Sequence, residues 1–154
     1  MIIDPQDVPT QRSTNYPDPF KALVAGRMRQ RLGKFAGLKN FGVNLVKLEP
    51  GSYSALRHWH SHQDEFIYIL EGELTLITDA GEQILTPGMA AGFPAGEANG
   101  HHLVNRSSVV GVYLEVGDRT PNDTAIYPDE PGLLTIPSPD GVFREFTYQD
   151  GTLS

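Results

Sequence analysis

The segment GSYSALRHWHSHQDEFIYILEG, residues 51–72, carries the strongest structural signal in this chain. Its second half contains EFIYIL (residues 65–70), a run of aromatic and β-branched residues that is typical of a β-strand. Its first half holds three of the five histidines of the protein, and the other two are adjacent at His101 and His102. Histidines that gather in two short clusters indicate a shared chemical role.

The histidines and the glutamate that follows them predict a metal site. Side chains of a strand alternate between its faces, so His58 and His60 point the same way and lie about 6.5–7 Å apart. Glu65 opens the next strand, and antiparallel pairing can bring its carboxylate beside them. His101 can add a third imidazole from another strand of a closed barrel. This set suits one divalent transition metal per chain (zinc, manganese, iron or nickel) and leaves two coordination positions open.

Other interpretations of the same side chains stay open. His58 and His60 could instead form hydrogen bonds inside a barrel, although burying this pair beside Glu65 is costly without an ion. His62 is expected to face solvent. If the histidines hold a metal, its uptake should fall below roughly pH 6, because imidazole must be neutral to bind an ion.

Two spaced patterns resemble the paired motifs of the cupin superfamily. The first is Gly51-x6-His58-x-His60-x4-Glu65-x6-Gly72. The second is Gly88-x5-Pro94-x-Gly96, followed by His101-x3-Asn105. With the strands around them, the resemblance extends over residues 41–117. It implies an all-β fold, a double-stranded β-helix or jelly-roll barrel with a metal in its mouth. Cupins are commonly dimers, so the resemblance also implies a homodimer.

The spacing departs from the family pattern at two places. Six residues separate the first glycine from His58 where cupins usually have five, which we interpret as a shift in the loop between them. Four residues separate the last glycine of the second motif from His101, where the family has two. The intact His101-x3-Asn105 spacing favours a small insertion, but Asn99 or His102 could also fill the ligand position.

The rest of the chain is organised around this core. Short apolar runs alternate with glycine and proline, which is typical of a β-barrel or sandwich. Residues 41–117 are expected to form the barrel. Residues 1–40 are expected to form an arm that packs on the barrel or on a partner, with a helical turn or a strand at 20–25. Residues 118–154 form a tail with a possible last strand at 142–148. The strands predicted within the barrel are residues 41–48, 53–60, 65–70, 74–78, 83–86, 90–93, 101–105 and 109–116.

Composition limits the partners of the protein. The chain has 154 residues, a net charge of −7 and no cysteine. This acidic balance disfavours nucleic acid and anionic membranes as partners, and no apolar run is long enough to cross a bilayer. We expect a cytoplasmic protein whose partners are a small-molecule ligand and a second copy of the chain. The one basic stretch, residues 27–31, is expected to be a solvated face, or else an anion-binding patch near the pocket mouth.

Three functions are compatible with a metal in a barrel mouth, because fold does not fix function. The resemblance favours an isomerase-like enzyme for an oxygen-rich small molecule, such as a sugar or sugar phosphate. The alternatives are an iron-dependent dioxygenase or oxalate-decarboxylase-like enzyme, and a non-enzymatic module that holds a small ligand. Tyr53, Phe93, Asn99 and Tyr113 are candidates for the pocket lining, whereas Trp59 should point away from the metal.

Overall fold

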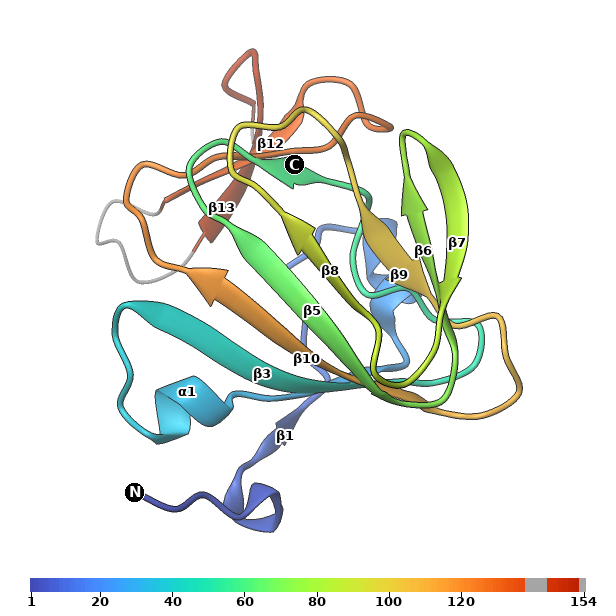
Figure 1. The fold of residues 1–154 in the computed structure, drawn as a ribbon. Coiled ribbons are helices and arrows are strands. Elements are labelled where there is room, and N and C mark those ends of the chain that lie inside the picture. The colour runs from blue at the N-terminus through green and yellow to red at the C-terminus, as the bar shows by residue number, and fades with distance from the viewer. Residues whose placement is uncertain (138–143, 153–154) are drawn as a thin grey trace.

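One large antiparallel sheet forms the main wall of the molecule. The computed structural model describes residues 1–137 and 144–152. Figure 1 shows the central strands of this sheet running side by side. Across its six strands the order is β1 (Thr10–Gln11), β2 (Arg27–Gln30), β3 (Phe41–Leu48), β10 (Gly111–Asp118), β5 (Glu65–Glu71) and β8 (Ala90–Phe93).

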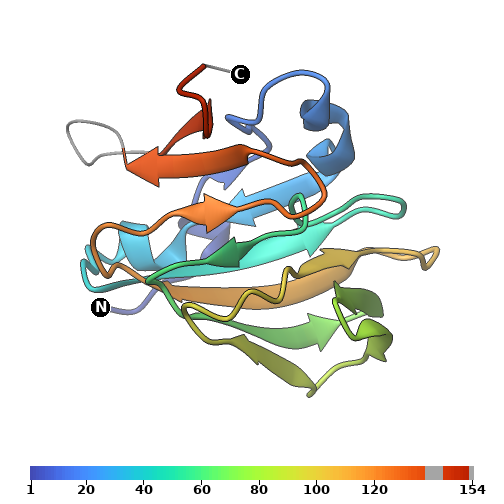
Figure 2. The same ribbon diagram turned by 90° about the horizontal axis from the view of Figure 1, so that it is seen from above.

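Two smaller sheets complete the barrel, as the view in Figure 2 shows. The four-stranded sheet has the order β13 (Arg144–Tyr148), β12 (Leu133–Pro137), β11 (Ala125–Ile126) and β4 (Trp59–His60). The three-stranded sheet has the order β7 (Gly81–Leu85), β6 (Leu74–Thr78) and β9 (His102–Val104). The described helices are single turns: η1 (Pro5–Asp7), η2 (Phe20–Val24) and α1 (Leu32–Phe35). None of them has the length or apolar character needed to cross a membrane.

Strand β5 shows why this sequence folds as a barrel wall. Ile67 and Ile69 are buried, whereas the side chains that alternate with them are largely exposed. This alternation aims one face of the strand into an apolar core that receives side chains from several strands. The turn into β6 depends on Gly72, whose φ is 75° and whose position has no room for a Cβ, because the carbonyl oxygen of Val110 would lie 2.7 Å away. The all-β jelly-roll prediction is confirmed. The main core cluster comprises Val46, Leu48, Ile67, Ile69, Leu74, Leu76, Leu85, Leu103 and Tyr113.

One predicted strand is largely absent. The prediction at 53–60 was wrong for most of its length, since only Trp59 and His60 form a strand, while Tyr53 and His58 make isolated bridges to β9 and its neighbour His101. Other partners occupy the backbone groups in between. The Leu56 N–H donates to the Tyr16 hydroxyl at 3.1 Å. Residues 54–57 therefore form a bent loop before His58.

The two ends of the chain pack on the barrel. Residues 20–25 contain the helical turn η2 rather than a strand. Tyr16 from the N-terminal part, Tyr127 and Leu133 from the C-terminal part, and the partly buried Phe146 form a second apolar cluster. The predicted strand at 142–148 corresponds to β13, although its first two residues lie outside the described part of the chain. These rings are covered by the same chain, and the homodimer stays a prediction.

Candidate metal centre

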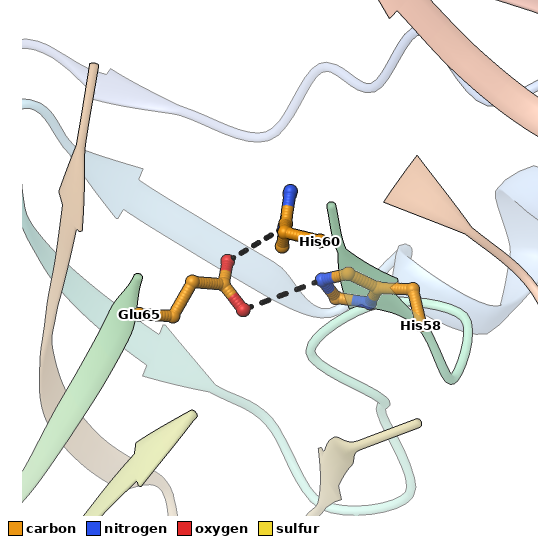
Figure 3. Close-up of side chains that lie close together, drawn as sticks. All are labelled: His58, His60 and Glu65. Atoms are coloured by element: carbon orange, nitrogen blue, oxygen red, sulfur yellow. Dashed lines mark ion pairs between the residues drawn. The ribbon is translucent and has the colours of Figure 1, made fainter. Parts of the chain in front are cut away.

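Four predicted metal ligands converge at one end of the barrel. His60 belongs to β4 and Glu65 opens β5, so a short connection brings them together. His58 and His101 pair directly across an isolated antiparallel bridge. Figure 3 shows the Glu65 carboxylate facing the imidazoles of His58 and His60. We call His58, His60, Glu65 and His101 the ligand cluster.

Glu65 is the centre of this cluster. Its Oε1 lies 3.1 Å from His60 Nε2, and its Oε2 lies 3.6 Å from His58 Nε2. The same Oε2 lies 2.5 Å from His101 Nε2. One ligand atom from each of His58, His60 and Glu65 fits within 4.8 Å of the others. A single ion can therefore reach these three side chains, with His101 beside them.

The hydrogen bonds of His58 Nδ1 and His60 Nδ1 show that the cluster fits a cation. His58 Nδ1 lies 2.7 Å from the carbonyl oxygen of Leu56, so that nitrogen must carry a proton and donate it. His60 Nδ1 lies 2.7 Å from Asp123 Oδ2 and donates in the same way. In the neutral imidazoles, both Nε2 lone pairs then face the Glu65 carboxylate. His60 Nε2 is buried and has no hydrogen-bond partner among the described residues. Opposed lone pairs of this kind are stabilised by a metal ion between them.

Asp123 holds the histidine-bearing segment in place. The carboxylate is buried, with 2% of the residue exposed. Besides the bond to His60, its Oδ1 accepts the backbone N–H groups of His62 and Gln63 at 2.9 and 3.0 Å. Arg144 reaches its Oδ2 at 2.6 Å from β13. Sequence reasoning missed Asp123 and Arg144, because no motif or spacing connects the polar tail to the histidines.

The ion-free cluster holds a proton that a metal would displace. Burial opposes protonation of His60, but the nearby carboxylates of Asp123 and Glu65 outweigh burial and raise the pKa to about 9. Burial would raise the pKa of Glu65, yet hydrogen bonds from His101, His58 and His60 lower it well below its usual range. Burial lowers the pKa of His101. At neutral pH the cluster therefore contains an ionised Glu65 and a protonated His60.

A cavity of about 170 Å³ opens beside the cluster, and His60 and His101 lie in its wall. Thr78, Glu97 and Asn99 give the wall polar groups, and Phe93 lines it while stacking on His101 with ring centroids 3.6 Å apart. Trp59 is also among the residues that line this cavity. It lies next to His60 in β4, and its direction away from the ligands stays a prediction.

A smaller cavity of about 30 Å³ lies on the inner side of the cluster. Tyr113, Phe93 and Glu115 line it together with His58, Glu65 and His101. Of the four residues predicted to line a pocket, Asn99 lines the larger cavity, Tyr113 lines the smaller one and Phe93 lines both. Tyr53 lines neither cavity.

The two alternatives for the second-motif ligand have other partners. His102 Nδ1 bonds the carbonyl oxygen of Ala55 at 2.9 Å. Asn99 accepts the backbone N–H of Asp79 at 2.9 Å from the wall of the larger cavity. His62 is exposed and bonds Ser61. Among the described residues, His101 is thus the second-motif side chain that touches Glu65.

Comparisons with known proteins agree with this geometry. A family model described as a cupin domain matches residues 44–117. A solved structure of a sugar phosphate isomerase from a cupin superfamily, from Silicibacter pomeroyi, is 42% identical with a TM-score of 0.93. That match covers 100% of this chain and 96% of the other.

More distant structures share the fold. A protein of Acidithiobacillus ferrooxidans, whose assignment as a sugar phosphate isomerase is provisional, is 26% identical with a TM-score of 0.73, covering 84% of this chain and 82% of its own. A polyketide cyclase of Streptomyces resistomycificus is 22% identical with a TM-score of 0.63, covering 77% of this chain and 78% of its own, and supports the fold alone. No protein of curated function matches the sequence.

Proposed function

This chain belongs to the cupin superfamily, and from that premise we propose that it is a metal-dependent isomerase of an oxygen-rich small molecule, such as a sugar or sugar phosphate. The observation that carries the metal requirement is the partly buried carboxylate of Glu65, which faces the Nε2 atoms of His58, His60 and His101. The reaction class is supported by the whole-chain similarity to the Silicibacter pomeroyi isomerase.

The residues of the ligand cluster would hold one divalent ion. His58, His60 and His101 offer Nε2 atoms, and Glu65 offers its carboxylate. A bound ion supplies Lewis acidity toward a carbonyl oxygen. Asp123 and the Leu56 carbonyl fix the ring orientations, so the donor atoms are preorganised before any ion or substrate arrives.

Glu97 is the residue we assign to proton transfer. An aldose becomes a ketose when one proton moves from C2 to C1 and another passes from the C2 hydroxyl to the C1 oxygen, so no atom is gained or lost. The first transfer needs a base that takes up a proton and returns it. Glu65 is engaged by three histidines. Glu97 is the one carboxylate among the described residues that line the larger cavity.

The cavity also limits the substrate. About 170 Å³ is smaller than the roughly 300–1,000 Å³ of drug-sized sites, so the cavity suits a compact molecule rather than a nucleotide. Hydroxyl groups of a sugar can bond Thr78 and Asn99 in its wall. Neither lysine nor arginine lines it within the described ranges, so a phosphate group would need a cation from elsewhere.

Deuterium exchange tests this proposal directly. Metal-loaded protein in D₂O should interconvert an aldose and its ketose and leave deuterium on carbon, as followed by proton NMR. Glu97→Gln should lower that rate by about 100-fold or more and keep the metal content, because the carboxamide cannot accept the proton. Glu82→Gln, an exposed change on β7, is the matched control and should leave the rate unchanged.

Two results would count against the proposal. Full exchange by Glu97→Gln would remove Glu97 from the proton path. Metal-dependent binding of sugars with no exchange and no turnover would favour the non-enzymatic binding module instead.

A further inference from the structure

Arg29 belongs to β2, and Arg31 and Arg119 directly follow the ends of β2 and β10. Because β2 and β10 both pair antiparallel with β3, these two ends lie at the same edge of the large sheet. Arg29 pairs directly with the fully buried Val46, which in turn pairs with Tyr113, so Arg29 lies on the inner face of the large sheet. Burial and the positive charges of Arg29 and Arg119 lower the pKa of Arg31. We call Arg29, Arg31 and Arg119 the arginine cluster.

Positive charge is in excess in this cluster. Glu115 is the carboxylate that faces it, and Glu115 Oε2 lies 3.8 Å from Arg29 Nε, too far for a hydrogen bond. The same Oε2 accepts Asn44 Nδ2 at 2.8 Å. Arg29 Nε is buried and has no hydrogen-bond partner in the described part of the chain. A buried donor left in this state costs free energy unless a ligand satisfies it.

Two other arginines, Arg27 and Arg12, have polar partners within the chain. Arg27 is buried, and its guanidinium donates to the carbonyl oxygen of Ser54 at 2.6 Å. The expectation of a solvated face for residues 27–31 was therefore wrong for Arg27. Arg12 forms an exposed ion pair with Glu49 at 2.9 Å. The arginine cluster differs from both, because no described carboxylate lies within hydrogen-bond reach of its guanidinium groups.

Two glycines leave space between the arginine cluster and the ligand cluster. A Cβ on Gly42 would lie 2.3 Å from Arg119 Nη2, so the Arg119 guanidinium rests over that glycine. A Cβ on Gly117 would lie 3.8 Å from the carbonyl oxygen of Asp64, an ordinary contact, so a small group fits above this glycine. Gly42 pairs with Gly117, and Gly117 pairs with Glu65. These three residues lie on adjacent strands about 5 Å apart, so the Cα atoms of Gly42 and Glu65 are roughly 10 Å apart.

We propose that Arg29, Arg31 and Arg119 form an oxyanion-binding subsite that holds the phosphate or carboxylate end of the substrate. The ligand cluster would hold the other end, across Gly117. Guanidinium groups bind such anions through paired, charge-assisted hydrogen bonds. This subsite would supply the cation that the larger cavity lacks, and its assignment to substrate rests on the proposed function.

Inorganic phosphate tests the subsite itself. Calorimetric titration should show that wild-type protein binds phosphate, and that Arg31→Gln/Arg119→Gln binds it at least about tenfold more weakly. The matched control Arg12→Gln/Arg106→Gln removes the same charge from two exposed ion pairs and should bind phosphate as the wild type does. Glu115→Gln should tighten binding, because it removes the competing carboxylate. A purely structural role for these residues predicts no such gain.

A second titration tests the assignment to substrate. Metal-loaded wild-type protein should bind ribose 5-phosphate at least about tenfold more tightly than ribose, and Arg31→Gln/Arg119→Gln should lose that preference. His58→Ala/His60→Ala should keep its affinity for inorganic phosphate. If wild-type protein binds phosphate through the arginines but takes up no metal and shows no turnover, the proposed isomerase is wrong and the subsite stands.

Three outcomes would overturn the inference. The subsite is refuted if wild-type protein does not bind phosphate, or if the arginine double variant binds it as tightly as wild type does. If phosphate binds through the arginines but ribose 5-phosphate binds no more tightly than ribose, the site serves a free anion and the substrate assignment is wrong.

Discussion

The ligand cluster and the groups around it come from different parts of the chain. The four ligands lie between residues 58 and 101: His60 and Glu65 belong to β4 and β5, and His58 and His101 form an isolated bridge. Their supports come from farther away: Asp123 and Arg144 follow the barrel strands, and the arginine cluster joins β2 to the end of β10. Local sequence spacing therefore indicates which residues are the ligands. The residues that orient and supplement these ligands become their neighbours only when the barrel closes.

Removal of two ligands should produce the largest effect. His58→Ala/His60→Ala should reduce the metal content from about one ion per chain to none, because the remaining two donors cannot hold an ion. The fold should persist, since the main core cluster lies on other side chains. Elemental analysis with circular dichroism checks both points. His62→Ala, from the same segment, should keep its metal, and full metal content in the double variant would refute the ligand assignment.

Asn105 belongs to the same motif as His101, but its contacts predict a role in stability rather than in metal binding. Its side chain is fully buried and donates to the carbonyl oxygens of Leu48 and Val109 at 2.8 and 2.7 Å. Asn105→Ala should lower the free energy of unfolding by about 2–4 kcal/mol, because both carbonyl oxygens lose a partner. Metal content should stay unchanged. Urea denaturation measures the first quantity, and a stable variant that has lost its metal would show that Asn105 belongs to the site instead.

A substitution of Asp123 tests whether the residues outside the ligand cluster affect metal binding. Asp123→Asn should weaken metal binding by about 10–100-fold, since outer partners of a ligating histidine fix its orientation and basicity. Competition with a chelator measures the affinity. Asp150→Asn, at an exposed turn near the end of the chain, is the control and should have no effect. An unchanged metal affinity in Asp123→Asn would mean that the hydrogen bond from His60 to Asp123 does not affect metal binding.

The smallest expected effect concerns pH. The raised pKa of His60, about 9, lies above the ordinary value of 6.5. The protonated ring therefore stabilises the metal-free fold fully below pH 6.5, and this contribution is lost as pH rises through about 9. A metal must displace the same proton, so its affinity should rise about tenfold per pH unit until pH 9. Calorimetry in buffers of different ionisation enthalpy should show about one proton released at pH 7.

A pH-independent affinity between 7 and 9 would mean that His60 is neutral before the metal arrives. The sequence alone places the loss of metal binding near pH 6, the ordinary range of histidine. The hydrogen bond to Asp123 moves this window upward, and no local pattern reveals that bond.

Much of the fold could be predicted from local sequence. The runs at 41–48, 74–78 and 90–93 form strands with the predicted bounds, because alternating apolar residues between glycine or proline turns favour only one local structure. The run at 53–60 failed, since its backbone groups bond to Tyr16 and other distant partners that no window of sequence contains.

The sequence by itself determined the residue types at the metal centre, their spacing and the all-β architecture, because these depend on a strand period of two residues and on short connections. Only the tertiary structure decided that His101, rather than His102 or Asn99, touches Glu65. It also decided that Asp123 orients His60 and that Arg29 lies beside Glu115. The physical reason is that hydrogen bonds and charge contacts across a closed barrel depend on how strands are ordered in space, which the local pattern of side chains does not specify.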